Sequence, residues 1–323
     1  MGQLTRIIGP IGAILTAAIL CSPPYLVAQS PAARTMAVTF DDLPYVAVGS
    51  TDYLHDAQRA TADILRVLAA HHVPVVAFVN EGKLDARGET DARIALLQRW
   101  VDAGAILGNH TYSHRELNAA TIEQFEDEIV RGWVVTPRLM ASRQPYTLYF
   151  RHPETHTGNT AEKKQAIDAF LAARGYTIAP HTVENADFMF NVPYVRARRA
   201  GDAALRERLM QAYLDHSFAA LQFAEDITPK VFERDIPQTF LIHANDITAD
   251  ALDTILSRLE SRGYRFITLD EAMRDPAYQT RNTLVTKGGP TWLWRWMKSK
   301  GLSVSFAADP EPPDWVTALY AAR

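Results

Sequence analysis

In the stretch MAVTFDD at residues 36–42, a short strand-forming run leads directly into two carboxylates. Residues 36–40 are apolar apart from Thr39, which predicts a buried strand ending at Asp41 and Asp42. In parallel α/β folds the active site forms at the carboxyl ends of the strands. An Asp pair after a strand is, on its own, more often a turn or a helix cap. On extended chain the two carboxylates are expected to point in opposite directions.

Short apolar runs alternate with longer amphipathic runs along the rest of the chain. Helical spacing is found at 56–70, 91–103, 161–174, 203–224 and 251–262, and strands are expected at 73–79, 105–107, 148–150, 176–179, 238–243 and 264–268. Gly104, Gly175 and Gly263 each separate a helix from a strand, where a helix end favours a left-handed residue. The alternation predicts an α/β fold with about seven parallel strands and outer helices, as a barrel or a doubly wound sheet.

The first residues read as a secretion signal. Arg6 precedes the apolar run 7–20, and Ala28 is the predicted cleavage point, so residues 1–28 are expected to be removed. The run is short for a membrane-spanning helix of about 20 residues, which favours export over a retained anchor. The mature chain is then expected to be periplasmic or secreted, without stable membrane insertion. Cys21 is the only cysteine and lies in this segment, so the mature chain would have no disulfide.

Residues 29–275 are expected to form the catalytic domain, and residues 276–323 a tail packed on it. Trp292, Trp294 and Trp296 stand in this tail beside basic residues. They are interpreted as packing residues, with a sugar-stacking or membrane-surface patch as the alternative. The formal net charge of -4 argues against a dedicated nucleic-acid binder, which usually has a basic surface.

Other polar residues follow later predicted strands. His110 and His114 are spaced so that both could lie on one face of a helical turn and bind one cation. Two histidines and a carboxylate leave positions open for water and substrate. Arg151 ends the strand at 148–150 and could hold a carboxylate, and Asp187 is interpreted as lying beyond a strand. His243 ends the strand at 238–243; each of these residues alone could equally be structural.

Together, and in this order, these motifs resemble those of the polysaccharide deacetylases of the NodB-homology type, carbohydrate esterase family 4. The resemblance covers residues 36–272 and rests on TFDD (39–42), HTYSH (110–114), RHP (151–153), the motif around Asp187, and LIH (241–243). It implies a distorted (β/α) barrel and a divalent metal, usually zinc, held by Asp42, His110 and His114. The other implied roles are Asp41 as base, Arg151 orienting Asp41, His243 as general acid and Asp187 as its partner.

The resemblance implies a hydrolase that removes N-acetyl groups from an acetylated glycan such as peptidoglycan or a chitin-like polymer. Three alternatives stay open: an O-acetyl esterase acting on xylan-like glycans, a hydrolase of a small non-glycan amide, and a glycan-binding protein with a dead site. Leu43 and Glu154 depart from the family pattern, which has Gly and an aromatic residue there. His152 and His156 are additional histidines near the site, interpreted as loop residues or substrate contacts.

Overall fold

The central strand is β1 (Arg34–Leu43), whose side chains are buried along most of its length. In the computed structural model, which describes residues 1–3, 9, 34–303 and 309–322, β1 pairs in parallel with β2 (Val75–Val79), β7 (Gln238–His243) and β8 (Tyr264–Phe266). Most of the predicted secretion signal, including Arg6, Cys21 and Ala28, lies outside the described residues. Among the described residues, no helix has the length and apolar character needed to span a bilayer.

The other strands extend the sheet on both sides of β1. The strands β3 (Ile106–Asn109), β4 (Tyr149–Phe150), β5 (Thr177–Ile178) and β6 (Val183–Glu184) complete the hydrogen-bonded order β5-β4-β3-β2-β1-β7-β6, and all pairs are parallel. A flat sheet of this order would place β5 and β6 about 29 Å apart. Residues 179–182 join them, and such a link reaches at most about 18 Å. The sheet therefore curls, which confirms the distorted (β/α) barrel.

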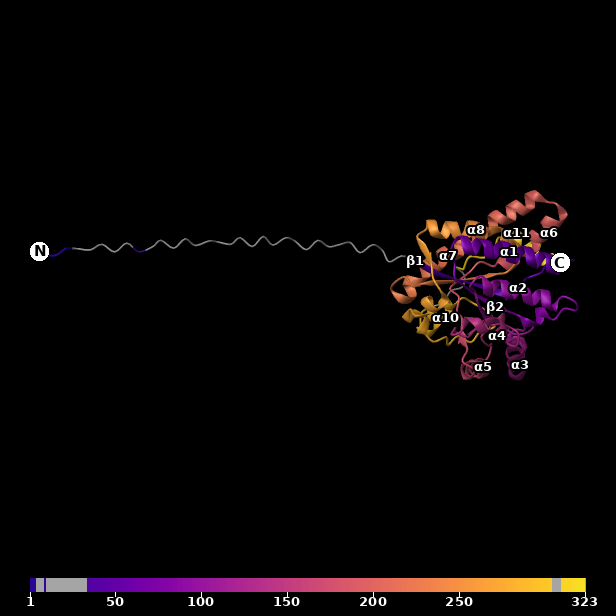
Figure 1. Cartoon of the computed structure of the whole chain (residues 1–323), viewed down its shortest axis with the longest axis horizontal. Helices are drawn as coiled ribbons and strands as arrows, with labels where there is room; N and C mark the ends of the chain where they lie inside the picture. The colour runs from indigo at the N-terminus through magenta and orange to yellow at the C-terminus, as the bar shows by residue number, and fades with distance from the viewer. Residues whose placement is uncertain (4–8, 10–33, 304–308, 323) are drawn as a thin grey trace. The chain divides into compact units, whose positions relative to one another are not determined.

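Helices surround the strands, as Figure 1 shows. The α-helices are α1 (Tyr53–Ala70), α2 (Thr90–Asp102), α3 (Ile122–Arg131), α4 (Thr136–Leu139), α5 (Ala161–Ala173), α6 (Asp187–Ala200), α7 (Ala203–Phe232), α8 (Asp246–Ser261), α9 (Leu269–Met273), α10 (Trp292–Ser299) and α11 (Asp314–Ala321). Single 3-10 turns are η1 (Glu81–Leu84), η2 (Leu117–Ala119), η3 (Met140–Arg143), η4 (Pro153–Thr155) and η5 (Pro276–Gln279). In α1 the buried positions include Ala57, Ala60 and Ile64, so the predicted apolar face packs on the sheet.

The predicted helix-to-strand glycines have the expected conformation. Gly104, Gly175 and Gly263 have φ of 100°, 77° and 82°, the left-handed region where glycine has no Cβ penalty. The sequence prediction missed β6 and α6. Asp187 is therefore the first residue of a helix that follows a two-residue strand, and α7 runs eight residues beyond the predicted end at 224, through Pro229 to Phe232.

The three tail tryptophans are buried. Trp292, Trp294 and Trp296 are between 1% and 5% exposed and belong to the main apolar core. Trp296 packs edge-on against Phe232 and Tyr278, at centroid distances of 5.5 and 5.2 Å. This supports the packing interpretation over a surface patch.

Candidate active site

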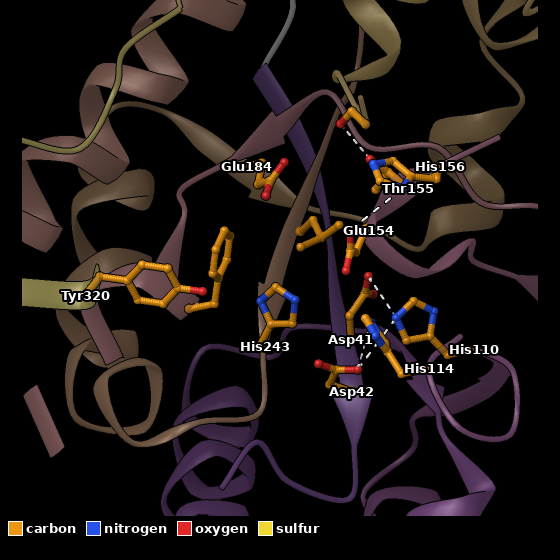
Figure 2. Close-up of a pocket in the computed structure, with 13 residues that line it drawn as sticks. Asp41, Asp42, His110, His114, Glu154, Thr155, His156, Glu184, His243 and Tyr320 are labelled. Carbon is orange, nitrogen blue, oxygen red and sulfur yellow. Dashed lines mark hydrogen bonds and ion pairs between the residues drawn. The ribbon is translucent and has the colours of Figure 1, made fainter. Parts of the chain in front are cut away.

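Side chains from the carboxyl ends of the strands converge on one cavity of about 480 Å³. Figure 2 shows the residues that line it. They are Asp41, Asp42, His110, His114, Glu154, Thr155, His156, Glu184, Phe188, Leu241, His243, Gly289 and Tyr320. Asp41 and His243 are register partners on the adjacent strands β1 and β7, so the sheet itself places these two side by side.

The two carboxylates at the end of β1 both reach this cavity. The expectation that they point in opposite directions is wrong, because β1 is irregular between Phe40 and Leu43. Asp42 has φ of 70°, a left-handed residue within the strand. This break in the pleat turns Asp42 to the same side as Asp41.

His110 and His114 converge through a loop and not through a helical turn, which corrects the sequence prediction. Residues 110–114 have no helical assignment, and Thr111 and His114 have φ of 65° and 60°. The two imidazole rings meet edge to face with centroids 5.0 Å apart. The sequence therefore predicted that these two histidines lie close together, but not the loop that brings them together.

Close backbone packing holds this histidine loop. A Cβ at Gly82 would lie 2.6 Å from the Tyr112 carbonyl oxygen, and one at Gly132 would lie 2.6 Å from the Thr111 carbonyl carbon. Glu128 accepts hydrogen bonds from the Ser113 N–H at 2.6 Å and from the Ser113 hydroxyl at 2.9 Å. Only glycine allows both close approaches without moving the loop.

Asp42, His110 and His114 form a set that fits a divalent metal. One ligand atom from each residue lies within 4.8 Å of the others. Asp42 Oδ1 is 3.4 Å from His114 Nε2 and 3.7 Å from His110 Nε2, and this buried oxygen has no hydrogen-bond partner in the described region. His110 Nδ1–H donates to the Arg151 carbonyl oxygen at 2.8 Å. The lone pair on Nε2 is therefore free to bind an ion.

The charges of these three residues also suit metal binding. Burial lowers the pKa of His110 well below its usual value and, less strongly, that of His114, so both rings are neutral ligands near neutral pH. Burial alone would raise the pKa of Asp42, but Lys83, His114 and His110 outweigh it and hold the pKa below its usual range. Lys83 Nζ lies 3.5 Å from Asp42 Oδ1 and donates to the Asp42 carbonyl oxygen at 2.7 Å.

Asp41 lies beside this set in a different environment. Its side chain is almost fully buried, and Arg151 Nη1 approaches its Oδ2 at 3.4 Å. Burial raises the pKa of Asp41 to about 6, although the positive charges of Arg151 and His243 oppose this shift. Arg151 is fully buried, and its Nη2 donates to the Thr39 hydroxyl at 3.1 Å. The guanidinium is therefore held in place next to Asp41.

His243 and Asp187 form the pair expected from the sequence motifs. His243 Nδ1–H donates to Asp187 Oδ1 at 2.6 Å, and the His243 backbone N–H donates to Asp187 Oδ2 at 2.7 Å. Thr248 also donates to Asp187 Oδ2, at 3.0 Å. Burial would lower the pKa of His243, but the Asp187 carboxylate outweighs it and raises the pKa to about 10. The ring is protonated at neutral pH.

The segment after the third motif has an unusual backbone. Glu154 and Thr155 have φ of 52° and 51°. The buried Arg295, from α10, donates to the Thr155 carbonyl oxygen and to the Thr157 hydroxyl, both at 2.6 Å. The Thr155 hydroxyl donates to the Gly289 carbonyl oxygen at 2.5 Å. The C-terminal segment therefore holds this loop against the cavity.

Several cavity residues were not singled out from the sequence. Glu184 is the last residue of the two-residue strand β6, which the sequence did not predict, so no strand end marked this carboxylate. Tyr320 comes from α11, more than seventy residues beyond the last motif, and no local pattern indicates it. His156 lines the cavity, whereas His152 is buried and stacks on Phe125. At the rim, Glu116, Glu154 and His156 make a second, more exposed cluster.

Comparison with known protein families finds a match in the N-terminal half of the chain. Residues 28–166 match the family model described as polysaccharide deacetylase. The matched range contains the metal-ligand set, Asp41 and Arg151, while Asp187 and His243 lie beyond it. No curated protein matches the chain significantly.

Solved structures of carbohydrate esterase family 4 are similar to this chain at low sequence identity. PdaA of Bacillus subtilis, a family 4 carbohydrate esterase, is 21% identical with a TM-score of 0.47, covering 76% of this chain and 82% of its own. A family 4 acetyl xylan esterase from Clostridium thermocellum, in complex with a cobalt ion, is 19% identical with a TM-score of 0.48, covering 75% and 91%. A family 4 pseudoenzyme from Bacillus anthracis is 19% identical with a TM-score of 0.48, covering 76% and 66%.

The family match over the metal-ligand set agrees with the motifs in the sequence and with the parallel, curled sheet. Residues 28–166 of this chain are similar to the polysaccharide deacetylase family.

Proposed function

We propose that this protein is a metal-dependent hydrolase that removes N-acetyl groups from an acetylated glycan, with a peptidoglycan or chitin-like polymer as substrate. The observation that carries the proposal is the placement of three functional groups in one cavity: a metal-ligand set, a buried carboxylate beside it, and a protonated histidine opposite. The secretion signal predicted from the sequence would place the enzyme outside the cytoplasm, where such polymers are found.

Asp42, His110 and His114 would hold the ion, and zinc is the expected metal. When bound, a divalent ion supplies Lewis-acid chemistry toward an acyl carbonyl and acidifies water. The chain contributes a neutral, buried pair of imidazoles and an anionic oxygen, a common catalytic ligand set that leaves coordination positions open.

Asp41 would act as the general base. With a pKa of about 6, its carboxylate is mostly ionised near neutral pH and still basic enough to take a proton from the attacking water. Arg151 holds Oδ2, while Oδ1 is buried without a hydrogen-bond partner among the described residues. The free oxygen is the one available to accept the proton.

His243 would act as the general acid. Its Nδ1–H is committed to Asp187, so the proton on Nε2 is the one that can be delivered to the departing nitrogen. An amine leaves only after protonation, whereas an ester alcohol needs less help. A histidine held in its acid form by a buried carboxylate therefore favours N-deacetylation over ester hydrolysis. The intact set also argues against a dead glycan-binding protein, which commonly lacks a ligand or the base.

The test is acetate release by the purified protein with zinc present, from peptidoglycan, chitin oligomers and acetylated xylan. We expect release from an N-acetylated glycan and its loss in Asp41→Asn, a variant that keeps the size of the side chain. Release from xylan alone would establish the esterase alternative. Release from none of the three, with metal bound, would contradict the glycan assignment and favour a small amide substrate.

A further inference from the structure

The cavity extends past His243 to a residue of the C-terminal helix α11. Tyr320 lines the cavity together with the catalytic groups. Figure 2 shows Tyr320 and the group formed by Asp41, His110 and His114 on opposite sides of His243, with the Tyr320 hydroxyl directed toward the cavity. Phe188 lies between, with its ring centroid 6.0 Å from that of Tyr320 and 6.2 Å from that of His243.

This position corresponds to the amine portion of the substrate. In the proposed reaction the acyl carbon would lie beside Asp41 and the three residues that would hold the metal, and the departing nitrogen would lie at His243. The part of the substrate that carries this nitrogen must extend from His243 in the direction away from the metal-ligand set. Tyr320 and Phe188 occupy that direction.

The ring and the hydroxyl of Tyr320 are available to bind a ligand. Within the described part of the chain, its ring contact is with Phe188 and its hydroxyl makes no hydrogen bond. A phenol hydroxyl can both donate and accept, and an aromatic ring offers a face for an apolar C–H surface. A sugar ring presents both kinds of surface.

Glu184 adds an acceptor on the same side of the cavity. It ends β6, and its register partner is Leu241 of β7, two residues before His243. The carboxylate is half-buried, lines the cavity, and lies 3.6 Å from His181 Nε2, a distance too long for a hydrogen bond. A carboxylate with free lone pairs accepts from hydroxyl groups, and it also favours the ammonium group formed when an acetamide is hydrolysed.

The helix that carries Tyr320 is fixed to the site. Val316 is fully buried, and Arg196 of α6 donates to the carbonyl oxygens of Leu319 and Ala322 at 3.2 and 2.5 Å. Because α6 begins at Asp187, the partner of His243, this one helix contacts both α11 and the general acid. Tyr320 is therefore held at the cavity by packing.

We infer that Tyr320 and Glu184 form a specificity-determining subsite that binds the hydroxylated ring carrying the scissile acetamide, an inference that rests on the proposed function. The hydroxyl of Tyr320 and the carboxylate of Glu184 hydrogen-bond the ring, and the Tyr320 side chain bounds the cavity beyond His243. The ligand class is an N-acetylated amino sugar.

The experiment has a binding arm and a kinetic arm. In the binding arm, calorimetry measures the affinity of an N-acetylglucosamine trimer for zinc-loaded Asp41→Asn protein, alone and combined with Tyr320→Phe or Glu184→Gln. We expect each change to weaken binding by about 2- to 10-fold, the effect of one lost hydrogen bond. Tyr146→Phe, a half-buried tyrosine outside the cavity, is the matched control and should leave affinity unchanged.

In the kinetic arm, kcat/KM is measured for the trimer and for an aryl acetate that has no sugar ring. Tyr320→Phe and Glu184→Gln should lower kcat/KM for the trimer and leave the aryl acetate unchanged. Acetate release without any effect of either variant on binding or on kcat/KM overturns the subsite and leaves the proposed function standing. Binding that depends on both residues, without acetate release, supports the subsite and overturns the proposed function. No trimer binding to the parent protein overturns the subsite.

Discussion

At the scale of single residues, the carboxylates of Asp41 and Asp42 are adjacent in sequence but have pKa values shifted in opposite directions. Burial dominates at Asp41 and raises its pKa to about 6, while Lys83 and two histidines keep the pKa of Asp42 below its usual range. Neighbouring groups whose pKa values are pushed apart can take different roles in one reaction. This difference fits the proposed roles of Asp41 as the base and Asp42 as an anionic metal ligand.

Replacing Asp41 tests this division of roles. Asp41→Asn removes the proton acceptor without removing a metal ligand, so kcat should fall about 10²- to 10⁴-fold while zinc content stays near that of the parent protein. Acetate release and metal analysis of the same sample measure both. Loss of zinc together with activity would instead make Asp41 a ligand.

The His243–Asp187 pair predicts the alkaline limb of the pH profile. The pKa of His243 is raised to about 10, so the acid form is present below that value and is lost as pH rises through it. In Asp187→Asn the stabilising carboxylate is gone, and the alkaline limb of kcat should move to lower pH. Asp250→Asn, at a carboxylate bonded to Tyr194 away from the cavity, is the control. An unchanged limb in Asp187→Asn would exclude His243 as the titrating acid.

At the scale of elements, the histidine loop depends on glycine at positions that are remote from the metal ligands in sequence. In Gly132→Ala the new Cβ would lie 2.6 Å from the Thr111 carbonyl carbon and 2.8 Å from the Tyr112 nitrogen. The loop must shift, and we expect zinc affinity to fall about 10- to 100-fold, as for other changes behind metal ligands. Gly288→Ala has no atom within 4 Å of its Cβ and should leave affinity unchanged. Competition against a chelator of known affinity measures both; equal affinities would show that the loop tolerates the shift.

The contrast between the strands and this loop shows what the sequence can reveal. The strand ends were predictable, because apolar runs followed by Asp41, Arg151 or His243 mark the carboxyl edge of a parallel sheet. The loop conformation and the break in β1 were not, because both depend on left-handed residues that are neither glycine nor asparagine. Such conformations are imposed by tertiary packing and have little signature in local propensity.

The strand β6 and the helix α6 were also not predicted, because their local sequence has no clear pattern. The two-residue strand β6 gives no periodicity, so α6 and the position of Asp187 at its start could not be placed. The contributions of Gly289 and Tyr320 to the cavity are contacts between segments far apart in the chain. A hydrophobic pattern reports the face that a segment buries, not the segment it meets.

At the scale of the whole molecule, the C-terminal region completes the cavity. Arg295 holds the loop after the third motif, and α11 carries Tyr320 to the side of His243.

The metal-ligand set joins β1 to the loop after β3, so an ion should also stabilise the fold. Zinc at 100 times its dissociation constant would add about 2.7 kcal/mol to the free energy of unfolding. Thermal unfolding with zinc or with a chelator should show a higher Tm with zinc, and Asp42→Ala should abolish the difference; an equal shift in Asp42→Ala would place the ion elsewhere.

Metal dependence is tested by a zinc titration of the chelator-treated protein, with acetate release from an N-acetylglucosamine oligomer as the readout. We predict no release without metal, recovery that saturates at one zinc per chain, and no recovery in His114→Ala at the same zinc concentration. Full activity in the metal-free protein, or equal recovery in His114→Ala, would contradict a metal-dependent deacetylase built on Asp42, His110 and His114.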